Sequence, residues 1–230
     1  MVKLGRFKNY YYIPLKMIDN IIFDLGGILV PENREGILAS VAESIEIGVQ
    51  NLEERVRANR SRIIKGEIGL VEFYSEVLEA TGRDNITAEQ VFLKHLEIYR
   101  ATSTQRDTQI LDLIERLKSN YYNVHCATNT EREIAEFNKR NGLFNYFGKR
   151  FISTDMGMSK EEVDFYHHIL SELRINPEQV VFIDNEQRYL EAAKQVGIHT
   201  ILYRRYQEGY PQLLRDLEKF GIRINTPPSS

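Results

Sequence analysis

Short apolar runs alternate with longer amphipathic segments through the second half of the chain. In residues 107–119, for example, Ile110, Leu111, Ile114 and Leu117 recur at helical spacing. The same kind of pattern predicts further helices over 131–140, 161–173, 188–197 and 211–220, and strands over 121–128, 149–153, 180–184 and 200–203. Strands that alternate with helices are typical of a parallel sheet covered on both faces.

The first strand is a short apolar run, Ile21 to Phe23, which ends at Asp24 and a Leu25-Gly26-Gly27 turn. The chain then shows no strand pattern until after residue 106, although a crossover between parallel strands needs only about a dozen residues. The segment in between predicts helices over 34–49, 52–64, 70–80 and 88–99. We therefore expect a helical insertion that leaves the sheet just after the first strand, in a position suited to a lid.

The predicted fold is thus an α/β, Rossmann-like parallel sheet with an inserted all-helical cap. The core comprises residues 17–31 and 106–224, the cap comprises 32–105, and 225–230 form a tail. Residues 1–16 are basic and aromatic and contain no acid, a composition that can bind RNA or anionic lipid. Met17 directly precedes the first strand and can itself serve as a start residue. For residues 1–16 we therefore favour an extension without a required role, or a simple docking segment, over nucleic-acid binding.

Composition indicates which partners and which cellular compartment to expect. The chain is 42% hydrophobic, enough for a sizeable core, and its net charge of −3 and pI of about 6.0 give no sign of a nucleic-acid or membrane partner. Cys126 is the only cysteine, so no intrachain disulfide is possible, which fits a reducing compartment. No apolar stretch approaches a membrane span of roughly 18–20 residues, and the N-terminus lacks the apolar core of a signal peptide. We expect a cytoplasmic protein.

Three of the predicted strands end in polar residues. The first strand ends at Asp24, the second at Thr128 and Asn129, and the fourth at Asp184 and Asn185. Open parallel sheets bind ligands outside the carboxyl ends of their strands. The three polar strand ends therefore predict one shared site.

The side chains at this site suit phosphoryl transfer. Two nearby carboxylates, Asp24 and Asp184, repel one another, and a Mg²⁺ ion relieves that repulsion while it binds phosphate oxygens. Asp24 can then attack phosphorus as a nucleophile and form an aspartyl-phosphate. The Thr128 hydroxyl and the Lys160 ammonium can bind the transferred oxygens. The backbone of Gly26 and Gly27 can approach the phosphate closely because neither residue has a side chain.

Four segments in this order resemble the motifs of the haloacid dehalogenase (HAD) superfamily. They are Phe23-Asp24-Leu25-Gly26-Gly27-Ile28-Leu29; Ala127-Thr128-Asn129; Gly157-Met158-Ser159-Lys160; and Phe182-Ile183-Asp184-Asn185 followed by Glu191-Ala192-Ala193 and Gly197. The resemblance covers about residues 18–205, and the helical insertion looks like that family's helical cap of the first type.

The resemblance implies a role for each matching residue. Asp24 corresponds to the nucleophile, Thr128 to the hydroxyl of the second motif and Lys160 to the lysine of the third. Asp184 corresponds to a Mg²⁺ ligand, and Gly26 to the residue whose backbone carbonyl binds the same ion. The implied activity is a Mg²⁺-dependent phosphatase that acts on a small phosphorylated metabolite. From the residues themselves we expect Gly26, Gly27 and Asn129 to contact the substrate and Asn185 to lie behind the metal ligands.

The chain departs from the family pattern at one position that bears on mechanism. Most phosphatases of the family carry a second aspartate, the general acid and base, where this chain has Gly26; Ile28, Glu161 and Asn185 also differ from the usual residues. General acid–base catalysis contributes roughly 10²–10⁴-fold. Its loss should affect alkyl phosphates most, because their alkoxide must be protonated as it leaves. Glu32, just after the first strand, is one candidate to replace the missing acid.

Two other functions compete with the phosphatase. Gly26 and Asn185 are also compatible with a protein that binds phosphate without turnover and whose cap reports occupancy. A 2-haloacid dehalogenase would likewise form an ester on Asp24, but without a metal. A dinucleotide-binding protein is disfavoured, since no third glycine follows Gly26-Gly27 and the charge of Asp24 would repel a pyrophosphate.

Overall fold

The computed structural model describes residues 18–205 and 209–224, so the predictions for the arm at 1–16 and the tail at 225–230 lie outside the described residues. Its centre is a five-stranded parallel sheet in the order β3-β2-β1-β4-β5. The strands are β1 (Asn20–Phe23), β2 (Asn123–Thr128), β3 (Arg150–Ile152), β4 (Val180–Asp184) and β5 (His199–Leu202). The predicted α/β fold with a parallel sheet is confirmed.

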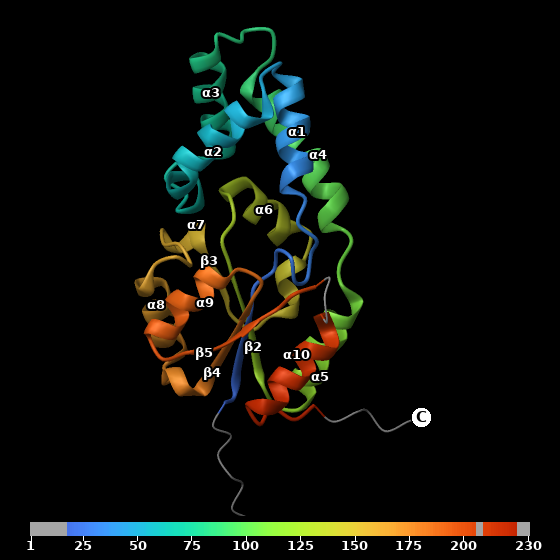
Figure 1. Cartoon of the computed structure of the whole chain (residues 1–230), viewed down its shortest axis with the longest axis vertical. Coiled ribbons are helices and arrows are strands. Elements are labelled where there is room, and N and C mark those ends of the chain that lie inside the picture. The colour runs from blue at the N-terminus through green and yellow to red at the C-terminus, as the bar shows by residue number, and fades with distance from the viewer. Residues whose placement is uncertain (1–17, 206–208, 225–230) are drawn as a thin grey trace, which may run out of the picture.

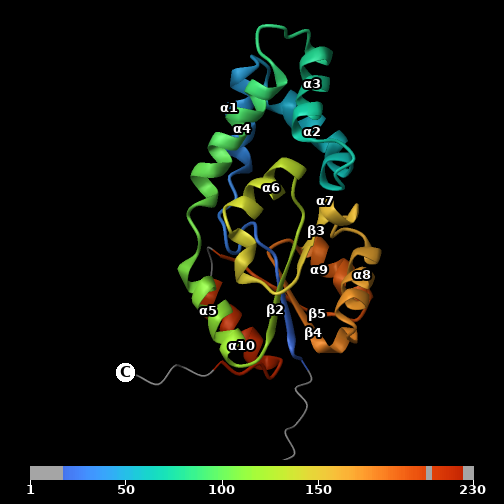
Figure 2. The same cartoon turned by 180° about the vertical axis from the view of Figure 1, so that it is seen from behind.

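Helices cover both faces of the sheet, as Figures 1 and 2 show. The flanking helices are α5 (Thr108–Ser119), α6 (Arg132–Arg140), α8 (Val163–Leu173), α9 (Gln187–Gln195) and α10 (Gly209–Lys219). Because alternate side chains of a strand point to opposite faces, Ile21 and Phe23 pack with α5 and α10, whereas Ile22 packs with α8 and α9. Short helical turns at Leu143–Tyr146, α7 (Ser153–Met156) and Pro177–Gln179 complete the connections.

The helical insertion lies beyond the carboxyl ends of the strands (Figure 1). It consists of α1 (Arg34–Ser44), α2 (Val49–Ile64), α3 (Leu70–Thr81) and α4 (Ala88–Ser103). Local sequence fixes its ends: Gly82 stops α3 in the left-handed conformation, and Thr87 with Gln90 forms a capping box at the start of α4. We call residues 34–103 the helical insertion; the domain boundaries predicted from the sequence stay predictions.

The insertion has a hydrophobic cluster of its own. Val41, Leu52, Phe73 and Val91 are among its buried members, and Ile134 of α6 joins them from the sheet side. The next residue, Ala135, packs into the cluster of the sheet instead. Helix α6 therefore contributes to both clusters and packs against the insertion.

One helix of the insertion is shorter than the sequence pattern predicts. The helix expected over 34–49 ends at Ser44, and Val49 begins the next helix. The reason is the backbone of the connection, since Glu46 takes a positive φ of 51° and Gly48 is the extended N-cap of α2. Ile45 and Val49 continue the helical spacing of Leu38, Val41 and Ala42, which hides this break in the sequence.

Within residues 18–205 and 209–224, no helix combines the length and the apolar character that crossing a membrane requires.

Candidate active site

The site forms where β1 and β4 lie side by side. Phe23 pairs with Ile183 in the parallel ladder, and the Asp24 N–H donates to the Ile183 carbonyl at 2.9 Å. The residues that follow, Asp24 and Asp184, therefore stand next to each other at the same edge of the sheet. This is also the place where the strand order reverses direction, from β1-β2-β3 on one side to β4-β5 on the other. Such switch points are where open parallel sheets bind ligands.

A buried lysine joins the two carboxylates. Lys160 Nζ lies 2.7 Å from Asp24 Oδ1 and 2.8 Å from Asp184 Oδ2. All three residues are buried, and Lys160 is only 1% exposed. Burial lowers the pKa of Lys160, but the two carboxylates outweigh it and hold that pKa above its usual value. The lysine therefore stays charged, and its one ammonium faces two carboxyl groups.

The same charges set the pKa of Asp24, the candidate nucleophile. Burial raises the pKa of Asp24 to about 7; the Lys160 ammonium opposes this shift and the neighbouring Asp184 carboxylate adds to it. The charge of one ammonium thus only partly offsets the repulsion between two carboxylates. A further cation beside them would reduce that repulsion.

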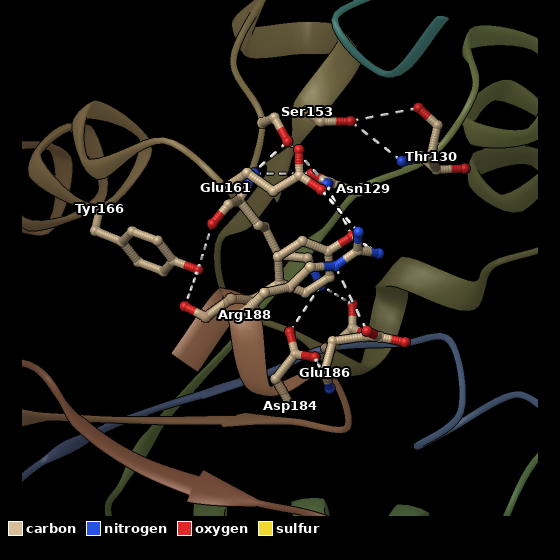
Figure 3. Close-up of polar contacts among 12 residues, drawn as sticks. Asn129, Thr130, Ser153, Glu161, Tyr166, Asp184, Glu186 and Arg188 are labelled. Atoms are coloured by element: carbon tan, nitrogen blue, oxygen red, sulfur yellow. Dashed lines mark hydrogen bonds and ion pairs between the residues drawn. The ribbon is translucent and has the colours of Figure 1, made fainter. Parts of the chain in front are cut away.

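Aromatic residues hold the lysine in place. Its Nζ lies 4.4 Å from the centre of the Tyr189 ring and 5.9 Å from that of Phe182. The Tyr166 hydroxyl bonds the backbone carbonyls of Lys160 and Tyr189, at 3.0 and 2.9 Å (Figure 3). Tyr166 and Tyr189 carry no motif signal in the sequence, and only the fold reveals that they position Lys160.

Asn129 at the end of β2 fastens the loop that carries the lysine. Its Oδ1 accepts the Lys160 backbone N–H at 3.0 Å, and its Nδ2 donates to the Ser159 hydroxyl at 3.0 Å. The side chain lies in this polar network (Figure 3). The contact of Asn129 with substrate, expected from the sequence, stays a prediction. Thr128, also predicted, is buried beside Asn129 and lines the same cavity as Asp24.

The two glycines after Asp24 lie in different surroundings. Gly27 has a positive φ of 70° and packs against Asn185, whose Nδ2 would lie 2.4 Å from a Cβ at this position. Gly26 lines the cavity, and a Cβ there would lie 2.8 Å from Glu32 Oε1. Gly26 therefore lies at the cavity wall and Gly27 beside Asn185, and the substrate contacts expected of both stay predictions.

A cavity of about 330 Å³ lies between the strand ends and the helical insertion. Asp24, Thr128 and Lys160 form part of its wall on the strand side. The insertion contributes apolar side chains such as Ile37, Val56 and Phe73, and polar ones that include Arg34, Arg60, Tyr74, His95 and Tyr99. The cavity is large enough for a small metabolite.

The donor set at the strand ends suits a hard divalent cation. Asp24 and Asp184 supply carboxylate oxygens, and Asn185 Oδ1 next to them is buried without a hydrogen-bond partner. Oxygen ligands, few of them carboxylates, are what Mg²⁺ prefers. In the part of the chain that the structure describes, no three His, Cys, Asp or Glu side chains cluster as a metal site.

These motifs and this fold define a hydrolase of a known family. The model of the haloacid dehalogenase-like hydrolases matches residues 18–197, and the chain belongs to that family. The resemblance read from the motifs is confirmed, and with it the expectation of an enzyme of this class.

Similar proteins include enzymes named as phosphatases. The D-ribitol-5-phosphate phosphatase of Bacteroides thetaiotaomicron is 24% identical over 196 residues, which cover 80% of this chain and 91% of that protein. A phosphorylated carbohydrates phosphatase of Thermotoga maritima is 26% identical over 75% of this chain and 63% of its own length.

Solved structures share the fold. A HAD family enzyme of Bacteroides thetaiotaomicron, in a magnesium complex, has a TM-score of 0.72 and 26% identity, over 87% of this chain and 100% of that one. A 2-haloacid dehalogenase of Pseudomonas syringae has a TM-score of 0.65 and 19% identity, over 89% and 100%. The dehalogenase likeness is one of fold alone, so the dehalogenase alternative gains no support beyond it.

Proposed function

We propose that the protein is a Mg²⁺-dependent phosphatase that acts on a small phosphorylated metabolite through an aspartyl-phosphate on Asp24. The observation that carries the proposal is the pair of buried carboxylates, Asp24 and Asp184, held by Lys160 beside a cavity. The similar proteins named as phosphatases support the same reaction.

In this proposal each residue at the strand ends has its own role in the reaction. The Asp24 carboxylate attacks phosphorus, the substrate's ester oxygen leaves, and water later hydrolyses the aspartyl-phosphate. The Lys160 ammonium and the Thr128 hydroxyl bind the transferred oxygens as charge builds on them. Mg²⁺, held by the carboxylates of Asp24 and Asp184 and the Gly26 carbonyl with Asn185 behind them, would screen the negative charges of nucleophile and phosphate.

We further propose that the substrate is a phosphorylated sugar or polyol and that the helical insertion serves as the cap over it. Tyr74 OH and His95 Nδ1 are hydrogen bonded at 2.7 Å, and Tyr99 and Asn138 are hydrogen bonded to each other nearby. All four side chains line the cavity. Polar groups of this kind recognise hydroxyls. The names of the similar phosphatases point to the same class of substrate.

The test is phosphate release from a panel of sugar and polyol phosphates that includes D-ribitol 5-phosphate, with and without Mg²⁺. We expect turnover that requires Mg²⁺ and falls at least ~10³-fold in Asp24→Asn, because the nucleophile is gone. Asp164→Asn, an exposed aspartate at the start of α8, is the matched control. A melting temperature that rises with Mg²⁺ and phosphate, without turnover of any substrate, would select the non-enzymatic alternative instead.

A further inference from the structure

A third carboxyl group, that of Glu32, reaches into the site from the loop between β1 and the helical insertion. Glu32 Oε1 lies 2.8 Å from the place where a side chain on Gly26 would put its Cβ, and the Glu32 Cγ and Cδ lie at 3.5 and 3.6 Å. In an aspartate, the carboxyl oxygens stand about 2.4 Å from their own Cβ, as bond lengths of roughly 1.5 and 1.25 Å require. The Glu32 carboxyl therefore occupies the space that an aspartate at position 26 would fill.

Glu32 also faces the reaction space. It lines the same cavity as Asp24, Thr128 and Lys160, and it is accessible along that cavity. The protein packed around its carboxyl group raises the pKa of Glu32, and the Glu186 carboxylate adds to that rise.

Other charged and polar groups act on the same carboxyl. The Asp184 carboxylate also raises the pKa of Glu32, whereas Lys160 and the Asn185 side chain lower it. A carboxyl group that lines this cavity is placed to donate a proton to a leaving group there.

We propose that Glu32 is the catalytic acid and base of this enzyme and replaces the side chain that Gly26 lacks. The assignment rests on the proposed phosphatase function. In the first step Asp24 forms a bond to phosphorus, the bond between phosphorus and the ester oxygen breaks, and the Glu32 carboxyl gives its proton to the departing alkoxide. In the second step the Glu32 carboxylate takes a proton from water as that water attacks the aspartyl-phosphate, which releases phosphate and restores both residues.

The leaving group provides a selective test. An alkyl phosphate such as D-ribitol 5-phosphate needs a proton as its alkoxide departs, whereas p-nitrophenyl phosphate releases a stable phenolate that needs none. Because kcat/KM reports the steps up to the first chemical event, Glu32→Gln should lower kcat/KM for D-ribitol 5-phosphate at least ~10²-fold. The same variant should change kcat/KM for p-nitrophenyl phosphate less than about fivefold, because the p-nitrophenolate leaves without a proton whereas the alkoxide of D-ribitol 5-phosphate does not.

Two further variants separate catalysis from folding. Glu35→Gln makes the same chemical change three residues away, on an exposed side chain in the first turn of α1, and should leave both substrates unaffected. Adding Gly26→Asp to Glu32→Gln returns a carboxyl to the same space and should restore turnover of D-ribitol 5-phosphate. The displaced atoms are the end of the flexible residue 32 side chain, so the new aspartate can be accommodated.

Equal losses on both substrates in Glu32→Gln, or no loss on either, would overturn the assignment while leaving the phosphatase in place. A folded Glu32→Gln variant whose alkyl turnover is not restored by Gly26→Asp would also count against it. If the unaltered protein hydrolyses neither these two substrates nor any other member of the sugar and polyol phosphate panel with Mg²⁺, the proposed function itself fails, and the role of Glu32 fails with it.

Discussion

The two walls of the cavity are built in different ways. The strand-side wall is made of buried charges whose positions follow from the register of β1 and β4, with Lys160 between two carboxylates. The wall formed by the insertion meets the rest of the protein through the buried Ile134 of α6 and through polar contacts of partly exposed side chains. Arg60 of α2 donates to the Tyr189 hydroxyl at 2.6 Å, and Lys65 pairs with Glu162.

This difference separates the chemistry from the choice of substrate. Removing one partner of a buried charge pair costs roughly 3–5 kcal/mol, whereas a surface pair contributes about 0–1 kcal/mol. The groups proposed to act on phosphorus are therefore held rigidly. The partly exposed polar contacts between the insertion and the sheet can break at smaller energetic cost, as opening of a lid requires.

The largest expected effect comes from breaking the buried charge cluster. Lys160→Met leaves the carboxylates of Asp24 and Asp184 without their ammonium, so the free energy of unfolding should fall by roughly 3–5 kcal/mol. Phosphatase turnover should fall at least ~10²-fold, because a charge that stabilises the transferred oxygens is lost. Urea unfolding and steady-state kinetics measure both effects.

The matched control for this variant is Lys149→Met. Lys149 is an exposed lysine that pairs with Glu172 at 3.0 Å, so the same substitution there should change stability little and activity not at all. Equal destabilisation by the two substitutions would contradict the contrast between buried and surface charges.

A second pair of variants compares the apolar interior of the two regions. Phe182 on β4 and Phe73 on α3 are both fully buried, one beneath Lys160 and the other in the cluster of the insertion. Replacing either with alanine should lower the free energy of unfolding by roughly 3–5 kcal/mol. Their kinetic effects should differ, because Phe73 lines the cavity whereas Phe182 supports the lysine.

Phe182→Ala should lower kcat for every substrate. Phe73→Ala should raise KM for a sugar phosphate and leave hydrolysis of acetyl phosphate, which is too small to reach the insertion, nearly unchanged. Measuring both substrates with both variants checks this. A loss of acetyl phosphate turnover in folded Phe73→Ala would show that the insertion also shapes the chemistry.

The strand-side wall was predictable because its geometry follows from chain topology. Parallel strands bring their carboxyl ends to one edge, so polar residues after β1, β2 and β4 had to meet. Lys160 comes from a loop, so strand topology does not place it; it was expected at the site because an ammonium suits phosphate oxygens and because it matches the lysine of the third motif. Its actual neighbours, Tyr166 and Tyr189, lie on helices whose side-chain directions the apolar pattern does not specify.

The wall formed by the insertion was less predictable for the same reason. Helical spacing gave its four helices, but the left-handed Glu46 that ends α1 early carries no sequence signal of its own. Glu32 was named as a candidate for the missing acid from its place after the first strand alone. Its approach to Gly26 depends on the path of the loop that leaves the sheet, which is a property of the folded chain.

A third prediction concerns a buried histidine on the sheet side. His125 on β2 accepts the Lys149 N–H on Nδ1 at 3.1 Å and lies 3.1 Å from Asn20 Oδ1 through Nε2, so the neutral ring satisfies both contacts. Burial lowers the pKa of His125 to about 4, and the Lys149 charge acts in the same direction. The unfolded chain binds this proton near pH 6.5 and the folded chain does not.

The contribution of neutral His125 to the free energy of unfolding should therefore be fully present above about pH 6.5 and should fall as the pH drops toward 4. The shift corresponds to a loss of about 2 kcal/mol between pH 7 and pH 5. Urea unfolding at both pH values measures this loss, and His125→Gln should reduce it, whereas the same change at the exposed His167 should not. An identical pH dependence in His125→Gln would assign the loss to other groups.

The smallest expected effect lies at the contact between the insertion and the sheet. Arg60→Ala removes the bond to the Tyr189 hydroxyl and the 3.7 Å pair with Glu161, and should lower the free energy of unfolding by less than about 1 kcal/mol. Tyr189→Phe removes the same hydroxyl but keeps the ring over Lys160. A double-mutant cycle between the two substitutions isolates their interaction. We expect a small coupling in stability and a larger change in KM for a sugar phosphate. A coupling above about 2 kcal/mol would mean that the insertion is fastened as firmly as the charges beneath it, and that opening the cavity requires more than the release of surface contacts.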